Sequence, residues 1–91
     1  MSVELQARAR AFLQRPIPAG IDYAPDSLAE RFIATYASRG RLPEDDEAIE
    51  LLGLACLESS AISDQFKNEP AASDYFRENA SILEAMLAER V

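Results

Sequence analysis

Proline and glycine constrain the fold of this chain more than any other residues, because they divide it into four apolar-periodic segments. Both residue types interrupt helices, and apart from Gly53 they lie between the segments rather than inside them. The interruptions are Pro16, Pro18, Gly20 and Pro25, then Gly40 and Pro43, then Asn68 with Pro70. Apolar residues recur at helical spacing in each segment, and none alternates as a strand does. The sequence predicts an all-α, small four-helix bundle with helices at roughly 3–14, 27–39, 43–66 and 71–90 and a Pro-rich loop between the first two.

Residues at the ends of the second expected helix support this division. Ser27 and Glu30 have the Ser-x-x-Glu spacing of a capping box, in which the hydroxyl and the carboxylate each accept a free backbone N–H. Gly40 follows the last periodic residue, at the position where a left-handed backbone ends a helix. The second helix is therefore expected to begin at Ser27 and to end just before Gly40.

An acidic run precedes the third apolar segment. Pro43 suits the first turn of a helix, and the acidic residues 44–47 lie where the helix dipole favours negative charge. Such a run could also bind a divalent cation, but consecutive helical residues point in different directions, so the cap and dipole explanation is preferred. For the fourth helix, Ser73 or Asp74 is the expected cap.

Length and composition place the chain among single globular domains. It has 91 residues, of which 48% are hydrophobic, and one domain is expected over 1–91. No stretch approaches the roughly 18 apolar residues of a membrane helix, and the start lacks the basic and apolar regions of a secretory signal. The single cysteine, Cys56, cannot form an internal disulfide. We therefore expect a cytoplasmic protein that does not bind membranes.

Negative charge is concentrated in the C-terminal half. Residues 1–42 contain six arginines and four acidic residues, whereas residues 43–91 contain twelve acidic residues and three basic ones, for a net charge of −7. A chain with this balance and no basic cluster repels phosphate backbones. Direct binding to nucleic acid is not expected, and a basic protein is the expected partner.

The residue inventory argues against catalysis. The chain has no histidine, the commonest general base, and the helical wheel places Cys56 on a core face without an activating partner. The carboxylates show no pairing that indicates tuned acid and base roles. We expect a protein that is not an enzyme, with no catalytic residues, no metal and no cofactor.

The third segment has two apolar faces when it is placed on a helical wheel. The broad face, expected to be core, contains Ala48, Leu51, Leu52, Ala55, Cys56 and Ile62, with Ile49 at its edge. A second stripe of Leu54, Leu57 and Ala61, spaced i, i+3, i+7, lies among glutamates on the other side. One explanation is that the first helix or the Pro-rich loop covers this stripe. The others are that it contacts a partner protein or a second copy in a homodimer.

These observations predict a non-enzymatic, acidic protein-protein interaction module of the inhibitor, immunity, adaptor or accessory-subunit type. Its third helix is expected to bind a basic partner, with leucines as buried contacts and carboxylates providing steering. The predicted partner-binding residues are Glu47, Glu50, Leu54, Leu57, Glu58 and Ala61. A structural homodimer that buries the same stripe is an alternative.

A short motif suggests another alternative function. Residues 26–28, Asp-Ser-Leu, resemble the phosphopantetheine attachment motif of acyl carrier proteins, and residues 42–47 resemble the acidic loop after the second helix of that family. The resemblance implies a carrier in which Ser27 is modified with the phosphopantetheine arm. A capping box explains Ser27 without any modification.

Overall fold

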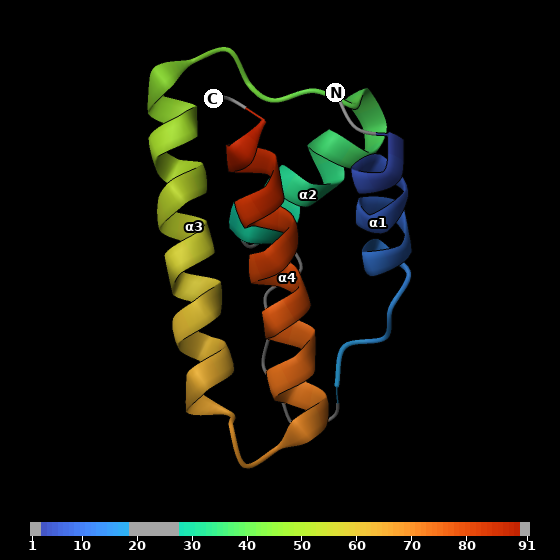
Figure 1. The fold of residues 1–91 in the computed structure, drawn as a ribbon, viewed down its shortest axis with the longest axis vertical. Helices are drawn as coiled ribbons and strands as arrows, with labels where there is room; N and C mark the ends of the chain where they lie inside the picture. Colours follow the sequence, from blue (N-terminus) through green and yellow to red (C-terminus); the bar gives the residue numbers. More distant parts are fainter. Residues whose placement is uncertain (1–2, 19–27, 90–91) are drawn as a thin grey trace.

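The computed structural model describes residues 3–18 and 28–89, which form four α-helices and contain no strand (Figure 1). The helices are α1 (Val3–Leu13), α2 (Leu28–Arg39), α3 (Asp46–Gln65) and α4 (Pro70–Ala88). The predicted all-α bundle is confirmed. Residues 19–27, which include most of the predicted Pro-rich loop and Ser27, lie outside the described part, and residues 14–18 are not helical.

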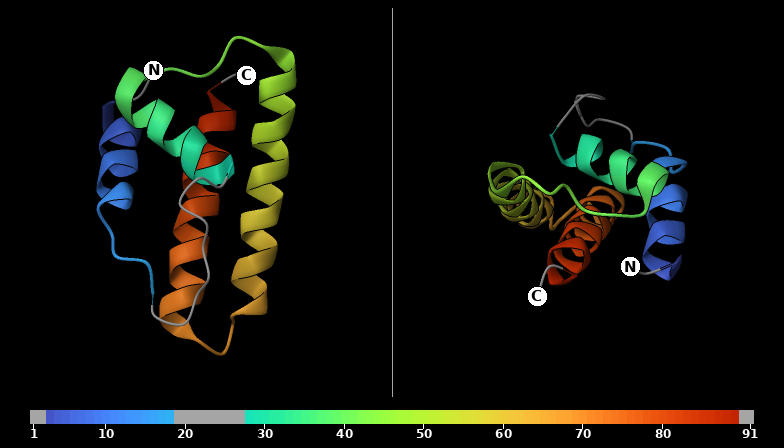
Figure 2. Two further views of the ribbon diagram at one scale, coloured as in Figure 1. Left: turned by 180° about the vertical axis from the view of Figure 1, so that it is seen from behind. Right: turned by 90° about the horizontal axis from the view of Figure 1, so that it is seen from above.

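The two long helices, α3 and α4, form an antiparallel hairpin with the most extensive helix contact in the molecule (Figure 1). The shorter α2 crosses behind them and contacts both, as well as α1 (Figure 2). Within the described residues α1 packs on α2 and α4 and makes no contact with α3. One side of α3 is therefore left without a neighbouring helix.

The core receives side chains from all four helices. Its most fully buried large residues are Tyr36, Phe76, Ile33, Leu52, Ile82, Leu83 and Met86. Phe12 of α1 joins this core through the ring of Tyr75, with the ring centroids 4.9 Å apart. Aromatic pairs at this separation add to the stability gained from area burial alone, so this ring pair stabilises the contact between α1 and α4.

Gly40 ends α2 as predicted. Its φ is 70°, in the left-handed region, and its N–H donates to the Tyr36 carbonyl oxygen at 2.8 Å. The α1 side chains supply further donors at this end, because Gln6 Nε2 and Arg10 Nε both donate to the Ala37 carbonyl oxygen, at 3.0 and 3.1 Å. The C-terminus of α2 is thus capped by its own glycine and by the neighbouring helix.

Helix α3 begins three residues later than predicted, and α4 begins one residue earlier. Helix α3 begins at Asp46 rather than Pro43, because the Asp45 carboxylate accepts the Glu47 N–H at 3.0 Å and makes Asp45 the N-cap. Helix α4 begins at Pro70, whose missing N–H costs nothing in the first turn. Neither Ser73 nor Asp74 is its cap, since both lie inside α4.

Candidate functional site

The second apolar stripe of α3 is exposed. Leu54 is 59% exposed and Leu57 is 69% exposed, although both residue types are usually buried. The other four predicted partner-binding residues, Glu47, Glu50, Glu58 and Ala61, are exposed on the same helix. All six predicted residues thus share one accessible face of α3.

Leu51 also belongs to this face, which corrects its predicted place in the core. It is 44% exposed, whereas Leu52 and Ala55 are buried as predicted. Ala48, Ile49, Cys56 and Ile62 are partly buried. The wheel had grouped Leu51 with the core because it lies at the margin of a broad apolar face. Leu51, Leu54 and Leu57 together form what we call the leucine ridge.

Two covers for the leucine ridge were considered from the sequence, the first helix and the Pro-rich loop. The first helix does not cover the ridge, and most of the loop lies outside the described residues. Figure 1 shows α3 at one edge of the molecule, with α4 between it and α1. Viewed from above in Figure 2, α1 again lies across α4 from α3. Within residues 3–18 and 28–89, the high exposure of Leu54 and Leu57 shows that nothing buries the ridge.

A buried polar seam fixes which side of α3 faces outward. The seam consists of Ser59 and Ser63 on α3 and Ser73 and Asn79 on α4, all buried. Ser59 Oγ donates to Asn79 Oδ1 at 2.9 Å. Ser63 Oγ donates to the Ser73 carbonyl oxygen at 2.9 Å, and Ser73 Oγ donates to the Ser63 carbonyl oxygen at 3.2 Å. Rotation of α3 would break these buried hydrogen bonds, so the seam holds the leucine ridge toward solvent.

Sequence reasoning missed this seam, because neither Ser59 nor Ser60 was placed on the core face of the third helix. Helix α3 continues through both residues. A signal was present, because Ser59 and Ser63 continue the helical spacing of the buried Leu52 and Ala55. Hydrophobicity alone could not show that hydroxyl groups would complete the core-facing stripe.

All charged side chains of helix α3 are negative. Its acidic residues are Asp46, Glu47, Glu50, Glu58 and Asp64, and it contains no basic residue. Glu47 and Glu50 lie on the N-terminal side of Leu54, and Glu58 directly follows Leu57. The leucine ridge is therefore an apolar strip bordered by carboxylates, without a cation on its own helix to neutralise them.

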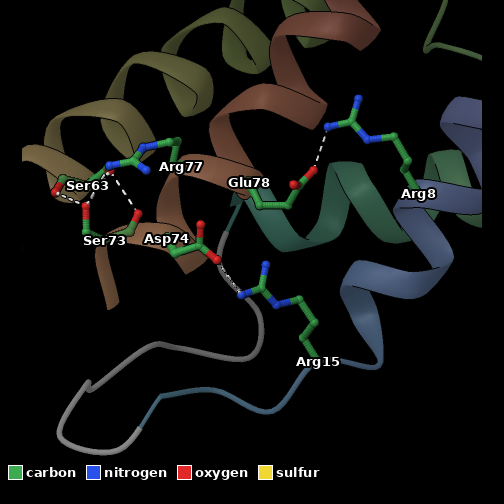
Figure 3. A network of polar contacts seen from close by, with 7 residues as sticks. All are labelled: Arg8, Arg15, Ser63, Ser73, Asp74, Arg77 and Glu78. Carbon is green, nitrogen blue, oxygen red and sulfur yellow. Dashed lines mark hydrogen bonds and ion pairs between the residues drawn. The ribbon is translucent and has the colours of Figure 1, made fainter. Parts of the chain in front are cut away.

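Two of the arginines form ion pairs with α4, one from α1 and one from the segment that follows it. Arg8 forms an ion pair with Glu78, and Arg15 forms one with Asp74 at 3.1 Å (Figure 3). The Arg15 guanidinium also lies over the Tyr75 ring, 5.7 Å from its centroid. The Arg8 pair joins α1 to α4, and the Arg15 pair joins the segment just after α1 to α4, so both ion pairs use carboxylates of α4 rather than of α3. In the same view, Arg77 donates to Ser73 Oγ at 3.3 Å, at the edge of the polar seam (Figure 3).

Cys56 does not have the surroundings of a nucleophile. It is partly buried, and its Sγ lies 3.5 Å from the Ala80 carbonyl oxygen. Burial, and to a lesser degree the negative charge of Glu84, raise the pKa of the Cys56 thiol. A reactive cysteine needs the opposite shift.

The acidic residues 44–47 act at the start of α3. Asp45 is the N-cap, and Asp46 and Glu47 occupy the first turn, where the helix dipole favours negative charge. Across residues 3–18 and 28–89, no group of three or more His, Cys, Asp or Glu side chains is arranged to hold a metal ion. The hydrogen bond from the Glu47 N–H to the Asp45 carboxylate supports the cap explanation of the run.

Comparisons with protein-family models, with curated proteins and with solved structures give no match to this chain. None of the described helices has the length and apolarity needed to span a bilayer. What the leucine ridge binds is therefore inferred from its own geometry and charge.

Proposed function

We propose that this protein is a non-enzymatic interaction module, of the inhibitor, immunity, adaptor or accessory-subunit type, that binds a basic partner protein through α3. The observation that carries this proposal is the leucine ridge. Leu54 and Leu57 remain 59% and 69% exposed among exposed glutamates, on a helix without a basic residue. The contact residues are those predicted from the sequence, Glu47, Glu50, Leu54, Leu57, Glu58 and Ala61, with Leu51 added.

The leucines supply affinity and the carboxylates supply steering. Full burial of a leucine side chain is worth about 1.5–3 kcal/mol relative to exposure, and Leu54 and Leu57 retain most of that gain for a binding event. Exposed carboxylates raise the rate of encounter with a basic surface and disfavour acidic partners. An apolar centre with a polar border is also the usual composition of a protein interface.

Charge favours a basic partner over a second copy of this chain. A homodimer that buried the leucine ridge would bring Glu47, Glu50 and Glu58 of each copy close to those of the other. Like charges in such proximity are destabilising, by about as much as opposite charges would stabilise. The acyl carrier alternative depends on Ser27, which lies outside the described residues, so no contact in the structure supports it.

Site-specific photo-crosslinking in the native host tests this proposal. A benzophenone amino acid is placed at Gln65, an exposed residue near the end of α3, and in a control at Thr35, an exposed residue of α2. We expect the Gln65 probe alone to capture a basic protein. The yield should fall when Leu54→Asp and Leu57→Asp are added. Equal capture from both positions, or capture that ignores the leucine substitutions, would show that α3 is not the binding surface.

A further inference from the structure

Gly53 lies in the middle of α3, and nothing in the described part of the chain requires a glycine there. A glycine in a helix interior costs about 0.5–1 kcal/mol relative to alanine. Gly53 does not have a positive φ, and a Cβ built on it meets no atom of residues 3–18 or 28–89 within 4 Å. Neither backbone conformation nor packing among these residues therefore requires glycine at this position. A close approach by another molecule is the remaining use for a missing side chain.

Five exposed residues of α3 follow the spacing of a helix-helix contact. Steps of three and four residues, averaging the 3.5-residue repeat of a coiled coil, connect Glu47, Glu50, Leu54, Leu57 and Ala61. Helix α3 has 20 residues, a length of about 30 Å at 1.5 Å per residue. This stripe is therefore long enough to receive several turns of a second helix.

The two sides of this stripe differ in size. Gly53 and Ser60 lie seven residues apart on one side, and Leu51 and Glu58 lie seven residues apart on the other. Small residues at a helix contact allow two backbones to approach closely. An incoming helix would therefore pack against the Leu51 side and come nearest to α3 over Gly53.

Charge determines what the incoming helix must carry. The stripe is acidic at Glu47 and Glu50, apolar at Leu54 and Leu57, and bordered by Glu58. A complementary helix has apolar residues in its centre and Lys or Arg beside them, because charged flanking positions select the partner in helix pairs. An extended peptide is a poorer fit, since strand addition needs a free sheet edge and α3 offers none.

We propose that the leucine ridge binds a basic amphipathic helix of the partner protein, which lies along α3 and approaches it most closely over Gly53. This inference rests on the proposed function and adds the chemical class and the secondary structure of the partner segment. It joins two independent observations, the exposed ridge and the unexplained glycine.

Binding of three synthetic peptides tests this inference by fluorescence anisotropy. The first, of about 21 residues or three heptads, has leucines at the a and d positions and Lys or Arg beside them. The second has the same composition, with its leucines dispersed so that no apolar face forms. The third has glutamate in place of every basic residue. We expect the first peptide to bind about tenfold or more tightly than the second, and the third to show no binding.

Substitutions on α3 then separate apolar contact from charge attraction. Leu54→Asp adds a negative charge, so a purely electrostatic complex would become tighter, whereas loss of a buried leucine contact should weaken binding about tenfold or more. The matched control is Val3→Asp, which changes an apolar residue of α1 that is 80% exposed. This control should leave the affinity unchanged.

Gly53→Ala should raise the stability of the protein while it weakens peptide binding. The variant should unfold at higher urea concentration than the wild type, because alanine favours helix, and should bind the first peptide about fivefold or more weakly, because its methyl group blocks close approach. Ser38→Ala, at an exposed position of α2, is the control that favours helix without affecting binding.

The inference is overturned if the dispersed peptide binds as well as the amphipathic one, if no peptide binds, or if Leu54→Asp or Gly53→Ala leaves the affinity unchanged. These failures differ from failure of the proposed function. Crosslinking from Gln65 that depends on Leu54 would still identify α3 as a protein-binding surface, with a partner segment that is not a basic helix.

Discussion

Gly40 occupies a position where a side chain has two separate costs. Its φ of 70° is unfavourable for other residues, and a Cβ there would lie 3.2 Å from the side chain of Gln6. We predict that Gly40→Ala lowers the free energy of unfolding by about 1–2 kcal/mol, the cost of a left-handed conformation for an L-residue with a Cβ. Urea unfolding followed by circular dichroism measures the change. Gly53→Ala, at a helical position where the added methyl group meets no described atom within 4 Å, should instead raise the urea concentration at the unfolding midpoint. Equal shifts in the two variants would contradict the conformational cost assigned to Gly40→Ala.

Cys56 makes the free energy of unfolding depend on pH in the alkaline range. Burial and the charge of Glu84 raise the thiol pKa in the folded chain, so folding favours the protonated thiol. The unfolded chain therefore loses this proton at a lower pH than the folded chain does. The stability that the protonated thiol contributes is fully present below the unfolded pKa and is lost as pH rises toward the folded pKa. We predict that the midpoint of the iodoacetamide rate against pH is higher for the folded protein than for the protein in urea.

Glu84→Gln checks the electrostatic part of this prediction. Removing the nearby negative charge should lower the pKa of Cys56 and speed alkylation of the folded protein at a fixed pH. Glu4→Gln, on α1, which does not contact α3, is the control and should leave the rate unchanged. Identical pH profiles for folded and unfolded protein would exclude the raised pKa.

At the scale of helices, the polar seam is the feature that orients α3 against α4. Ser59 Oγ and Asn79 Oδ1 are both buried and 2.9 Å apart, so removal of either group leaves the other without this partner. We predict that Ser59→Ala lowers the free energy of unfolding by about 1–3 kcal/mol, the cost of an unmade buried hydrogen bond. Ser60→Ala, at the exposed neighbouring position, should change it by no more than about 0.5 kcal/mol.

A double-mutant cycle tests whether the two residues act together. Asn79→Ala should lower the free energy of unfolding by more than Ser59→Ala does, because it also leaves a cavity. The double variant should lower it by less than the sum of the two single effects. Additive effects would mean that the hydrogen bond does not contribute to the contact between α3 and α4.

The number and approximate extent of the helices could be predicted from sequence because prolines and glycines lie between them. The start of α3 could not, since Pro43 and Asp45 are both suitable near a helix start and only the hydrogen bond to Glu47 distinguishes them. Ser73 was assigned to a cap for a related reason. Its hydroxyl suits helix starts, but it bonds across to Ser63 instead.

The exposed face of α3 was predicted in outline, and its width was not. A helical wheel gives the direction of each side chain but not which directions the other helices cover. Leu51 lies at the margin between the two faces, and the packing of the other helices leaves it 44% exposed. Gly53 had been noted only as an exception to the pattern of helix breakers, because its open surroundings can be known only from coordinates.

For the whole molecule, the uneven charge separates surfaces with different roles. Two of the arginines in residues 1–42, Arg8 and Arg15, pair with carboxylates of α4 and help hold the bundle together. The carboxylates of α3 surround exposed leucines, where they oppose contact with another acidic surface. The same glutamates that would steer a basic partner would therefore also keep the free protein from associating through its leucine ridge.

This dual role predicts a monomer whose self-association depends on three particular glutamates. Sedimentation velocity of the wild type in physiological salt should show a monomer. The variant Glu47→Gln, Glu50→Gln, Glu58→Gln should show mass that rises with concentration, since the leucine ridge is then no longer bordered by like charge. The control Glu4→Gln, Glu69→Gln, Glu84→Gln makes the same change in net charge at exposed positions outside these three. It should remain monomeric, and Leu54→Asp should return the first variant to a monomer. A wild-type dimer that Leu54→Asp dissociates would instead make the second copy the occupant of the ridge.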